Sequence, residues 1–104
     1  MAQFDVFVNP LAALRRAYPF VVAMQSEFTI SGAEQLVAPI ASTDYRPSQI
    51  RRVMPVVALQ GNDHVVVVPR LTVFRSRDLK EKVSSIASAR APLLAAIDYL
   101  FFGV

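Results

Sequence analysis

Residues 56–68 read Val-Val-Ala-Leu-Gln-Gly-Asn-Asp-His-Val-Val-Val-Val, and this stretch decides the fold class. Two apolar runs rich in valine, residues 56–59 and 65–68, flank a polar cluster that contains glycine, asparagine and aspartate. Pro69 follows directly and favours a strand end or a bulge, because proline cannot donate a ladder hydrogen bond. The stretch therefore predicts an antiparallel β-hairpin whose loop covers residues 60–64.

Strand-sized patterns continue on both sides of this hairpin. Residues 3–8 begin with alternating polar and apolar side chains, which predicts a strand with one buried face. Apolar and β-branched runs predict further short strands at residues 20–24, at residues 36–38 with Pro39 ending the strand, and at residues 71–74. The expected connections are a loop or short turn at 11–17, a turn at Ser31-Gly32 and a loop at 43–52.

The last part of the chain changes its period from two residues to about 3.6. Either Ser85 or Ser88 can cap the start of a helix, and Pro92 limits how far upstream a straight helix runs. Gly103 is a natural place for the helix to end. The spacing predicts one core-facing stripe made of Leu93, Leu94, Ile97, Leu100, Phe101 and Val104. Short strands followed by one terminal helix indicate an α+β, mainly β, fold.

Length and composition limit the class of protein. The chain has 104 residues, which predicts a single domain over residues 1–104, and it contains no cysteine. The apolar content of 54% and the mean hydropathy of +0.40 are high for so small a protein. No apolar run reaches the roughly 20 residues of a membrane-spanning helix, and no secretory signal is visible. We expect a cytoplasmic protein without membrane contact, whose surplus apolar surface is covered by oligomerisation.

The charge of the chain is mildly basic. The net charge is +3 and the isoelectric point is about 9.8. The basic residues form pairs and short clusters, and acidic residues are interspersed among them. A nucleic-acid-binding protein usually carries a continuous basic stripe, so direct nucleic-acid binding is not expected. An acidic protein partner is as compatible with this charge.

Few residues offer catalytic or metal-binding chemistry. His64 is the only histidine and the chain has no cysteine, so neither a second histidine nor a cysteine can form a metal-binding pair with it. We interpret it as a solvated histidine of the hairpin loop. The acidic residues are scattered, and the three glycines build no phosphate-binding loop. The sequence therefore predicts no catalytic residue, no metal site and no cofactor.

Phe102 lies outside the apolar stripe of the predicted helix. At about 100° per residue it falls on the opposite side, together with Asp98, Ala95 and Ala91. A large aromatic side chain beside a carboxylate, turned away from the core, is typical of an anchor for a protein partner. Two other interpretations stay open: the helix frays at its end, or a second subunit covers Phe102. Tyr99 is off the stripe on the other flank, which predicts that the helix is covered on more than one side.

Five segments, in order along the chain, carry a resemblance to a known family. They are Gln-Phe-Asp-Val-Phe at 3–7, Val-Ala-Met-Gln-Ser at 22–26, Pro-Ile-Ala-Ser at 39–42, Met-Pro-Val-Val at 54–57 and Ala-Ile-Asp-Tyr-Leu-Phe-Phe-Gly-Val at 96–104. They resemble the first strand of the CcdB toxins, their Val-Gln-Ser strand end, their Pro-Leu-Ala and Tyr-Pro-Val-Val segments, and their final helix, which finishes in Phe-Trp-Gly-Ile. The resemblance covers essentially the whole chain.

This resemblance implies a fold and a function. The implied fold is a partly open, SH3-like antiparallel β-barrel with a C-terminal α-helix, assembled as a homodimer. The implied function is that of a toxin in a type II toxin–antitoxin module, which binds the A subunit of DNA gyrase through the tip of its last helix and traps the enzyme on cleaved DNA. A cognate CcdA-like antitoxin, with a disordered and often acidic tail, would neutralise it.

The resemblance also assigns the gyrase contact to particular positions. Phe102 stands where the family has tryptophan, so a ring is kept while the indole N–H donor is lost. Asp98 stands where the family has asparagine, and an ionised carboxylate can only accept hydrogen bonds. Thr29 replaces an apolar residue. The full set implied to contact gyrase is Phe28, Thr29, Asp98, Phe101, Phe102, Gly103 and Val104.

Two alternative functions stay open. One is a CcdB-like protein whose toxicity is lost or redirected, an interpretation that the changes at Asp98 and Phe102 allow. The other is a toxin endoribonuclease of the MazF/Kid type, which shares the barrel fold and needs a basic groove and an acid–base pair. The residues available for these roles are Arg70, Arg75 and Arg77 with Asp78 or His64.

Overall fold

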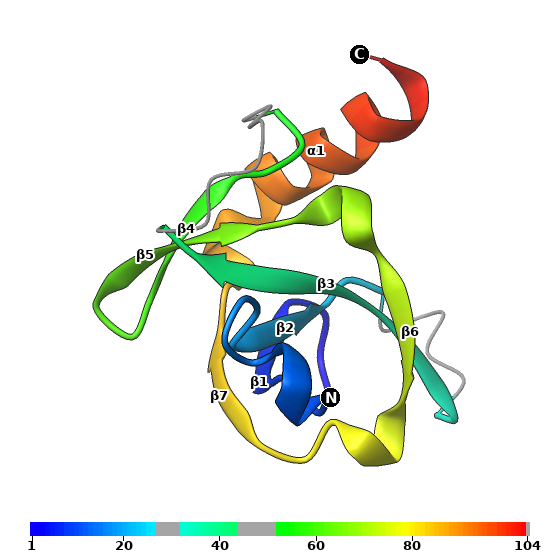
Figure 1. Cartoon of the computed structure of the whole chain (residues 1–104). Helices are drawn as coiled ribbons and strands as arrows, with labels where there is room; N and C mark the ends of the chain where they lie inside the picture. The colour runs from blue at the N-terminus through cyan, green and yellow to red at the C-terminus, as the bar shows by residue number, and fades with distance from the viewer. Residues whose placement is uncertain (27–31, 44–51, 104) are drawn as a thin grey trace.

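A computed structural model describes residues 1–26, 32–43 and 52–103 of the protein. These residues form a curled antiparallel sheet and one α-helix that lies across one end of it (Figure 1). The strands are β1 (Asp5–Val8), β2 (Phe20–Ala23), β3 (Glu34–Ser42), β4 (Val56–Leu59), β5 (Asn62–Val66), β6 (Thr72–Arg75) and β7 (Lys82–Ser85). The helix is α1 (Arg90–Phe102), and short 3-10 turns are η1 (Ala12–Leu14), η3 (Val68–Arg70), η4 (Ser76–Asp78) and η5 (Ala87–Ala89). The α+β, mainly β prediction is confirmed, and the curled sheet fits the SH3-like, partly open barrel.

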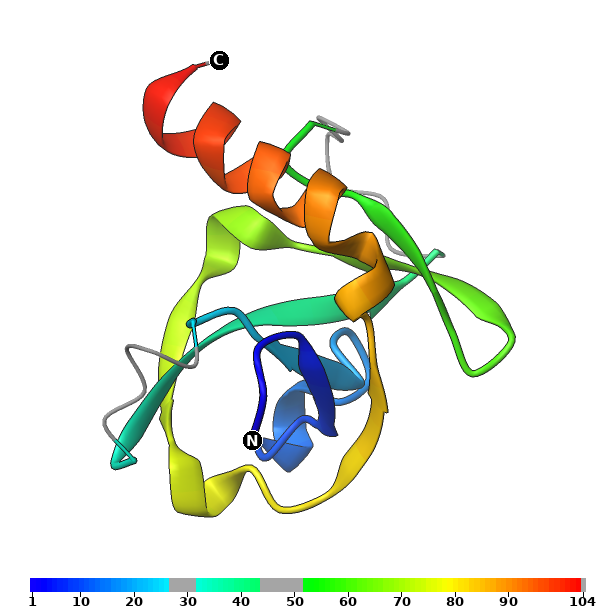
Figure 2. The ribbon, with the colours of Figure 1, turned by 180° about the vertical axis from the view of Figure 1, so that it is seen from behind.

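The sheet is organised around β3, which has neighbours along both of its edges. The strand order is β4-β5-β3-β2-β1-β7, and β6 pairs with β3 outside this path. Val37 pairs with Ala23 of β2 on one edge and with Thr72 of β6 on the other. Further along, Ile40 pairs with Phe20 of β2 and with Val66 of β5. β5 and β6 therefore follow one another along the same edge of β3, and the sheet curls to accommodate both (Figure 2).

Pro39 does not end the third strand, so that part of the sequence prediction is wrong. β3 runs through Pro39 for nine residues, and Pro39 pairs with Val21 of β2. The proline lies where the partner of β3 changes from β6 to β5, between the pairs formed by Val37 and Ile40. Its carbonyl oxygen accepts a hydrogen bond from the Val67 N–H at 2.9 Å. A residue without an N–H is tolerated here because neither the β6 ladder nor the β5 ladder continues through this position on that edge of β3.

The predicted hairpin is confirmed as β4 and β5, but its loop is shorter than expected. Leu59 pairs directly with Asn62, so the loop consists of Gln60 and Gly61 alone. Both have positive φ angles, 53° for Gln60 and 80° for Gly61. Two-residue loops with positive φ at both positions match the right-handed twist of the flanking strands. For this reason the polar residues after Gly61, predicted as loop, belong to β5.

The first strand is buried on both of its faces, whereas the sequence predicted one buried face. Val6 lies in the main core cluster, and its neighbour Phe7 lies in a second cluster with Val21 and Leu79. The second face is covered because the sheet curls over itself, which an alternation pattern does not report. β1 begins at Asp5, after Phe4, whose φ of 69° takes the chain out of the strand conformation.

The other connections follow the local sequence signals. The short turn predicted within residues 11–17 is η1, and the strand predicted at 71–74 is β6 with a shift of one residue. Pro69 lies in η3, beyond the end of β5, as a strand-ending proline should. In the predicted turn and loop, Ser31 and residues 44–51 lie outside the described residues.

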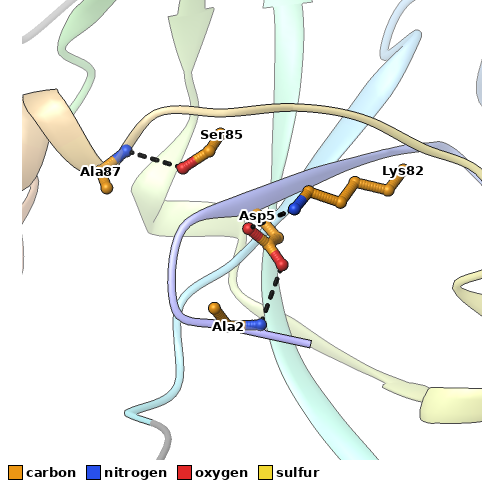
Figure 3. Close-up of polar contacts among 5 residues, drawn as sticks. All are labelled: Ala2, Asp5, Lys82, Ser85 and Ala87. Atoms are coloured by element: carbon orange, nitrogen blue, oxygen red, sulfur yellow. Dashed lines mark hydrogen bonds and ion pairs between the residues drawn. The ribbon is translucent and has the colours of Figure 1, made fainter.

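A buried carboxylate on β1 ties this strand to β7, the strand that precedes the helix (Figure 3). Asp5 is buried, and one of its oxygens accepts a hydrogen bond from the Ala2 N–H at 2.8 Å. Its other oxygen lies 3.3 Å from Nζ of Lys82 on the edge strand β7. Because Asp5 also pairs with Ser85 across the β1–β7 ladder, this ion pair fixes the edge strand from which α1 departs.

The helix begins differently from the prediction, since neither Ser85 nor Ser88 caps it. The N-cap position is Ala89, which makes no side-chain capping bond. The Ser85 hydroxyl instead accepts a hydrogen bond from the Ala87 N–H at 3.3 Å (Figure 3). The reason is that η5 is inserted between β7 and α1, so Ser85 lies four residues and Ser88 one residue before the N-cap position. Pro92 lies in the first turn of the helix, where its missing N–H costs little.

The hairpin loop can be tested by substitution of Gly61. We expect Gly61→Val to lower the free energy of unfolding by about 1–2 kcal/mol, because a β-branched residue is strained at positive φ. A side chain at this position meets no neighbour within 4 Å, so steric clash does not contribute. Chemical denaturation measures the change. Gly61→Asn is the matched control, since asparagine tolerates positive φ, and an equal loss for both variants would contradict the assigned cause.

Candidate functional site

The first half of α1 is anchored in the core. Leu93 and Ala96 are fully buried in the main cluster, and Leu94 and Ile97 pack against it. At an ordinary core position, burial of a leucine side chain is worth about 1.5–3 kcal/mol. The helix is thus held firmly at its base, while its last turns extend beyond the strands (Figures 1 and 2).

One flank of the helix is covered by the segment that precedes β4. The Tyr99 ring packs against the cluster that contains Val53 and Met54. The guanidinium carbon of Arg52 lies 4.2 Å from the centre of the same ring, a cation–π contact. This confirms that the helix is covered on more than one side, as the position of Tyr99 predicted.

The end of the helix is exposed and apolar. The exposed fraction is 37% for Leu100, 64% for Phe101 and 74% for Phe102. The sequence placed Leu100 and Phe101 on a core-facing stripe, which is wrong for these two residues because the helix is longer than the surface that supports it. We refer to Asp98, Phe101, Phe102 and Gly103 as the helix tip.

The helix does not fray before Phe102. Gly103 takes the left-handed conformation, with φ 73° and ψ 18°, and its N–H donates to the Tyr99 carbonyl oxygen at 3.0 Å. This glycine ends the helix as predicted. The interpretation of Phe102 as part of a frayed end is therefore wrong, and its ring is presented on regular helix.

Asp98 and Phe102 share the outward face, as helical geometry predicted. Both are exposed, and so are Ala91 and Ala95 on the same face. Asp98 forms no ion pair or side-chain hydrogen bond with any residue that the structure describes. The tip thus presents one carboxylate beside a large aromatic surface. The other positions implied by the resemblance, Phe28, Thr29 and Val104, lie outside the described residues.

Of the residues considered for ribonuclease chemistry, Arg75 and Asp78 lie together, whereas His64 lies far from both. Arg75 lies 3.9 Å from Asp78 in an exposed ion pair at the β6 end of β3. His64 pairs with Ser42 at the opposite end of β3, whereas Arg75 pairs with Glu34. The eight steps between these β3 residues correspond to roughly 26 Å along the strand. An acid–base pair that uses His64 with Asp78 does not form.

His64 is not a solvated loop residue, which corrects the sequence interpretation. It lies in β5 and is buried, with its Nδ1 3.0 Å from the Asn62 carbonyl oxygen. Its ring meets Phe20 edge-on, with 5.6 Å between ring centroids. Its role is therefore one of packing. Across residues 1–26, 32–43 and 52–103, no three His, Cys, Asp or Glu residues are grouped closely enough to hold a metal ion.

The sequence reasoning missed a hollow beside β6. It has a volume of about 410 Å³, and exposed Leu14 and Val73 lie in its wall. Arg70 is the one charged residue in its described lining. A neighbouring hollow of about 480 Å³ shares Leu11 and Phe74 with it and adds Arg15 and Lys80, balanced by acidic Asp78 and Glu81. The apolar pair Leu11 and Leu14 was the available signal, since both lie in a segment predicted to be a connection.

Comparison of the chain with models of known protein families gives one match. The model of the CcdB protein family matches residues 3–103, almost the full length of the chain. The chain belongs to the CcdB family. A comparison with individual curated proteins found no significant match.

Membership of the CcdB family implies a toxin of a toxin–antitoxin module that acts on DNA gyrase. Such a toxin is a poison of gyrase and not an enzyme in its own right. In general it has two kinds of partner, gyrase and an antitoxin. Among the described residues, no helix is both long enough and apolar enough to cross a membrane.

The contrast between base and tip of α1 predicts opposite effects of two substitutions. We expect Phe102→Ala to change the free energy of unfolding by less than about 0.5 kcal/mol, because the ring is mostly exposed. Leu93→Ala should cost about 2–5 kcal/mol, because it leaves a cavity in the core. Denaturant titration of both variants checks this. A large loss for Phe102→Ala would mean that the ring supports the fold.

Proposed function

We propose that this CcdB-family chain binds the A subunit of DNA gyrase through the helix tip and traps the enzyme on cleaved DNA. The observation that carries the proposal is the exposed pair Phe101 and Phe102 at the end of a helix whose base is buried. Aromatic residues are enriched among the hot spots of protein interfaces. A contiguous exposed apolar surface usually marks a binding site.

The rigidity of the tip supports tight binding. Phe102 belongs to regular helix and Gly103 closes it with a hydrogen bond to Tyr99. On the flank, the Arg52 guanidinium lies over the Tyr99 ring and adds a contact to this part of the helix. Binding then loses little conformational entropy in these side chains, so more of the contact energy contributes to affinity.

Phe28, Thr29 and Val104 complete the proposed contact. This assignment rests on the resemblance alone, since these residues lie outside the described part of the chain. We further propose a homodimer, because Leu100 and Val56 leave apolar surface exposed in addition to the aromatic tip. The interaction would take place in the cytoplasm, where gyrase meets the chromosome.

We also propose where the antitoxin binds. The hollow beside β6 combines apolar walls, including Val73, with Arg70 at its rim. β6 pairs with β3 along one edge, and among the described strands no other pairs with it. An extended, acidic tail could add its backbone to such an edge, place apolar side chains in the hollow and pair a carboxylate with Arg70.

Gyrase-mediated DNA cleavage tests the proposed toxin function. We expect the intact chain to trap cleaved DNA with purified gyrase, and a chain that lacks residues 103 and 104 to lose this effect. Phe102→Ala should weaken gyrase binding by about 2 kcal/mol or more, roughly 30-fold, while the fold is kept. The assay measures the amount of linear DNA released after denaturation of the complex.

The controls distinguish the remaining alternatives. Circular dichroism and denaturation must show that each variant is folded. A folded intact chain that traps no cleaved DNA would contradict the gyrase proposal and favour lost or redirected toxicity. Cleavage of RNA that depends on Arg70 and Arg75 and persists without residues 103 and 104 would favour the ribonuclease alternative.

The antitoxin proposal predicts a charge effect in the hollow. Val73→Glu places a carboxylate where an acidic tail should bind, so we expect the affinity for the cognate antitoxin to fall at least tenfold. Ala58→Glu is the control, because Ala58 is an exposed strand residue that does not line the hollow. Isothermal titration calorimetry provides the affinities. Equal losses in both variants would contradict the assigned location.

A further inference from the structure

The end of β3 that pairs with β6 carries a buried amide, and the segment after β6 carries a buried hydroxyl. The Gln35 side chain is completely buried, with an exposed fraction of 0%. Neither its Oε1 nor its Nε2 has a hydrogen-bond partner among the residues that the structure describes, and the same holds for the buried Oγ of Ser76. A buried polar group without a partner is costly, so native proteins rarely leave one unsatisfied.

The strand register places both groups on one face of the sheet. Gln35 lies two residues before Val37, a member of the second core cluster, and side chains two residues apart point to the same face. On β6, Phe74 pairs with Gln35 and packs against the same cluster. Ser76 stays in this register, because its N–H donates to the Ala33 carbonyl oxygen at 3.0 Å. Gln35 and Ser76 are therefore diagonal neighbours, with roughly 7–8 Å between their Cα atoms.

The turn η4, which starts at Ser76, closes the second core cluster at this end. It carries the chain from β6 towards β7 (Figure 1). Leu79, directly after the turn, is buried in the cluster, and its N–H donates to the Ser76 carbonyl oxygen at 3.1 Å. The Gln35 amide and the Ser76 hydroxyl thus lie between the sheet and the turn, without a hydrogen bond to each other.

We infer that this enclosed position binds one ordered water molecule, which bridges the Gln35 amide and the Ser76 hydroxyl. A glutamine amide and a serine hydroxyl both donate and accept hydrogen bonds, and a water molecule can match either role. Buried waters typically make about three hydrogen bonds to polar groups that are otherwise unsatisfied. The complete burial of Gln35 also favours the smallest ligand. The water ties β3 to the turn through which the chain passes to β7.

A high-resolution crystal structure of the full chain tests the inference directly. We expect one ordered water at about 2.7–3.2 Å from Oγ of Ser76 and from one polar atom of the Gln35 amide. A direct hydrogen bond between the two side chains, another protein atom bonded to the Gln35 amide, or a position without water would each show that the inference is wrong.

Thermal unfolding provides an independent measurement in solution. Ser76→Ala removes one partner of the water, and we expect the unfolding midpoint to fall by roughly 4 °C or more. Gln35→Met has a side chain of similar length without hydrogen-bonding atoms and should expel the water. In this background, Ser76→Ala removes a hydroxyl that no longer has a partner, so the midpoint should not fall further.

A control variant shows whether the two sites are coupled. Gln60→Met makes the same exchange at an exposed glutamine of the β4–β5 loop, so Ser76→Ala should keep its full effect in that background. If Ser76→Ala has the same effect in the Gln35→Met and Gln60→Met backgrounds, the two groups are independent and no water bridges them.

Discussion

Strand β3 must serve β2 on one edge and both β5 and β6 on the other, and the rest of the structure depends on this arrangement. The change of partner at Pro39 separates β5 from β6, and the chain crosses between them through η3. η3 in turn contacts α1, so the position where β3 changes partner also supports the helix. The ion pair of Asp5 with Lys82 fixes the other approach to the helix. Placement of the tip is thus a consequence of how the sheet curls.

Local chemistry accounts for the parts of the fold that the sequence predicts. The hairpin, the strand end at Pro69 and the helix end at Gly103 each depend on neighbouring residues and on backbone preferences. The prediction that Pro39 ends a strand is wrong because the cost of a missing N–H depends on the strand that this N–H would face. At Pro39 that edge of β3 lies between the β6 and β5 ladders, which is a tertiary property. The two buried faces of β1 have the same origin, since curling of the sheet leaves no trace in the alternation of residues 3–8.

The candidate site also has features that the sequence predicts and features that depend on tertiary structure. Helical geometry alone places Asp98 and Phe102 on the outward face, and the structure agrees. Exposure of Phe101 could not be derived, because periodicity gives the direction of a side chain and not the point at which its support ends. The contact of Arg52 with Tyr99 joins residues far apart in the chain, and no local pattern encodes it.

The division of α1 into a buried base and an exposed tip has an evolutionary consequence. Substitutions at Leu93 change the stability of the fold, whereas those at the exposed residues Asp98 and Phe102 change mainly the affinity for the target. A target that escapes by mutation can then be followed by single codon changes in the toxin, with no compensating change in the core. Adaptation of the tip and conservation of the barrel can therefore proceed independently within one chain.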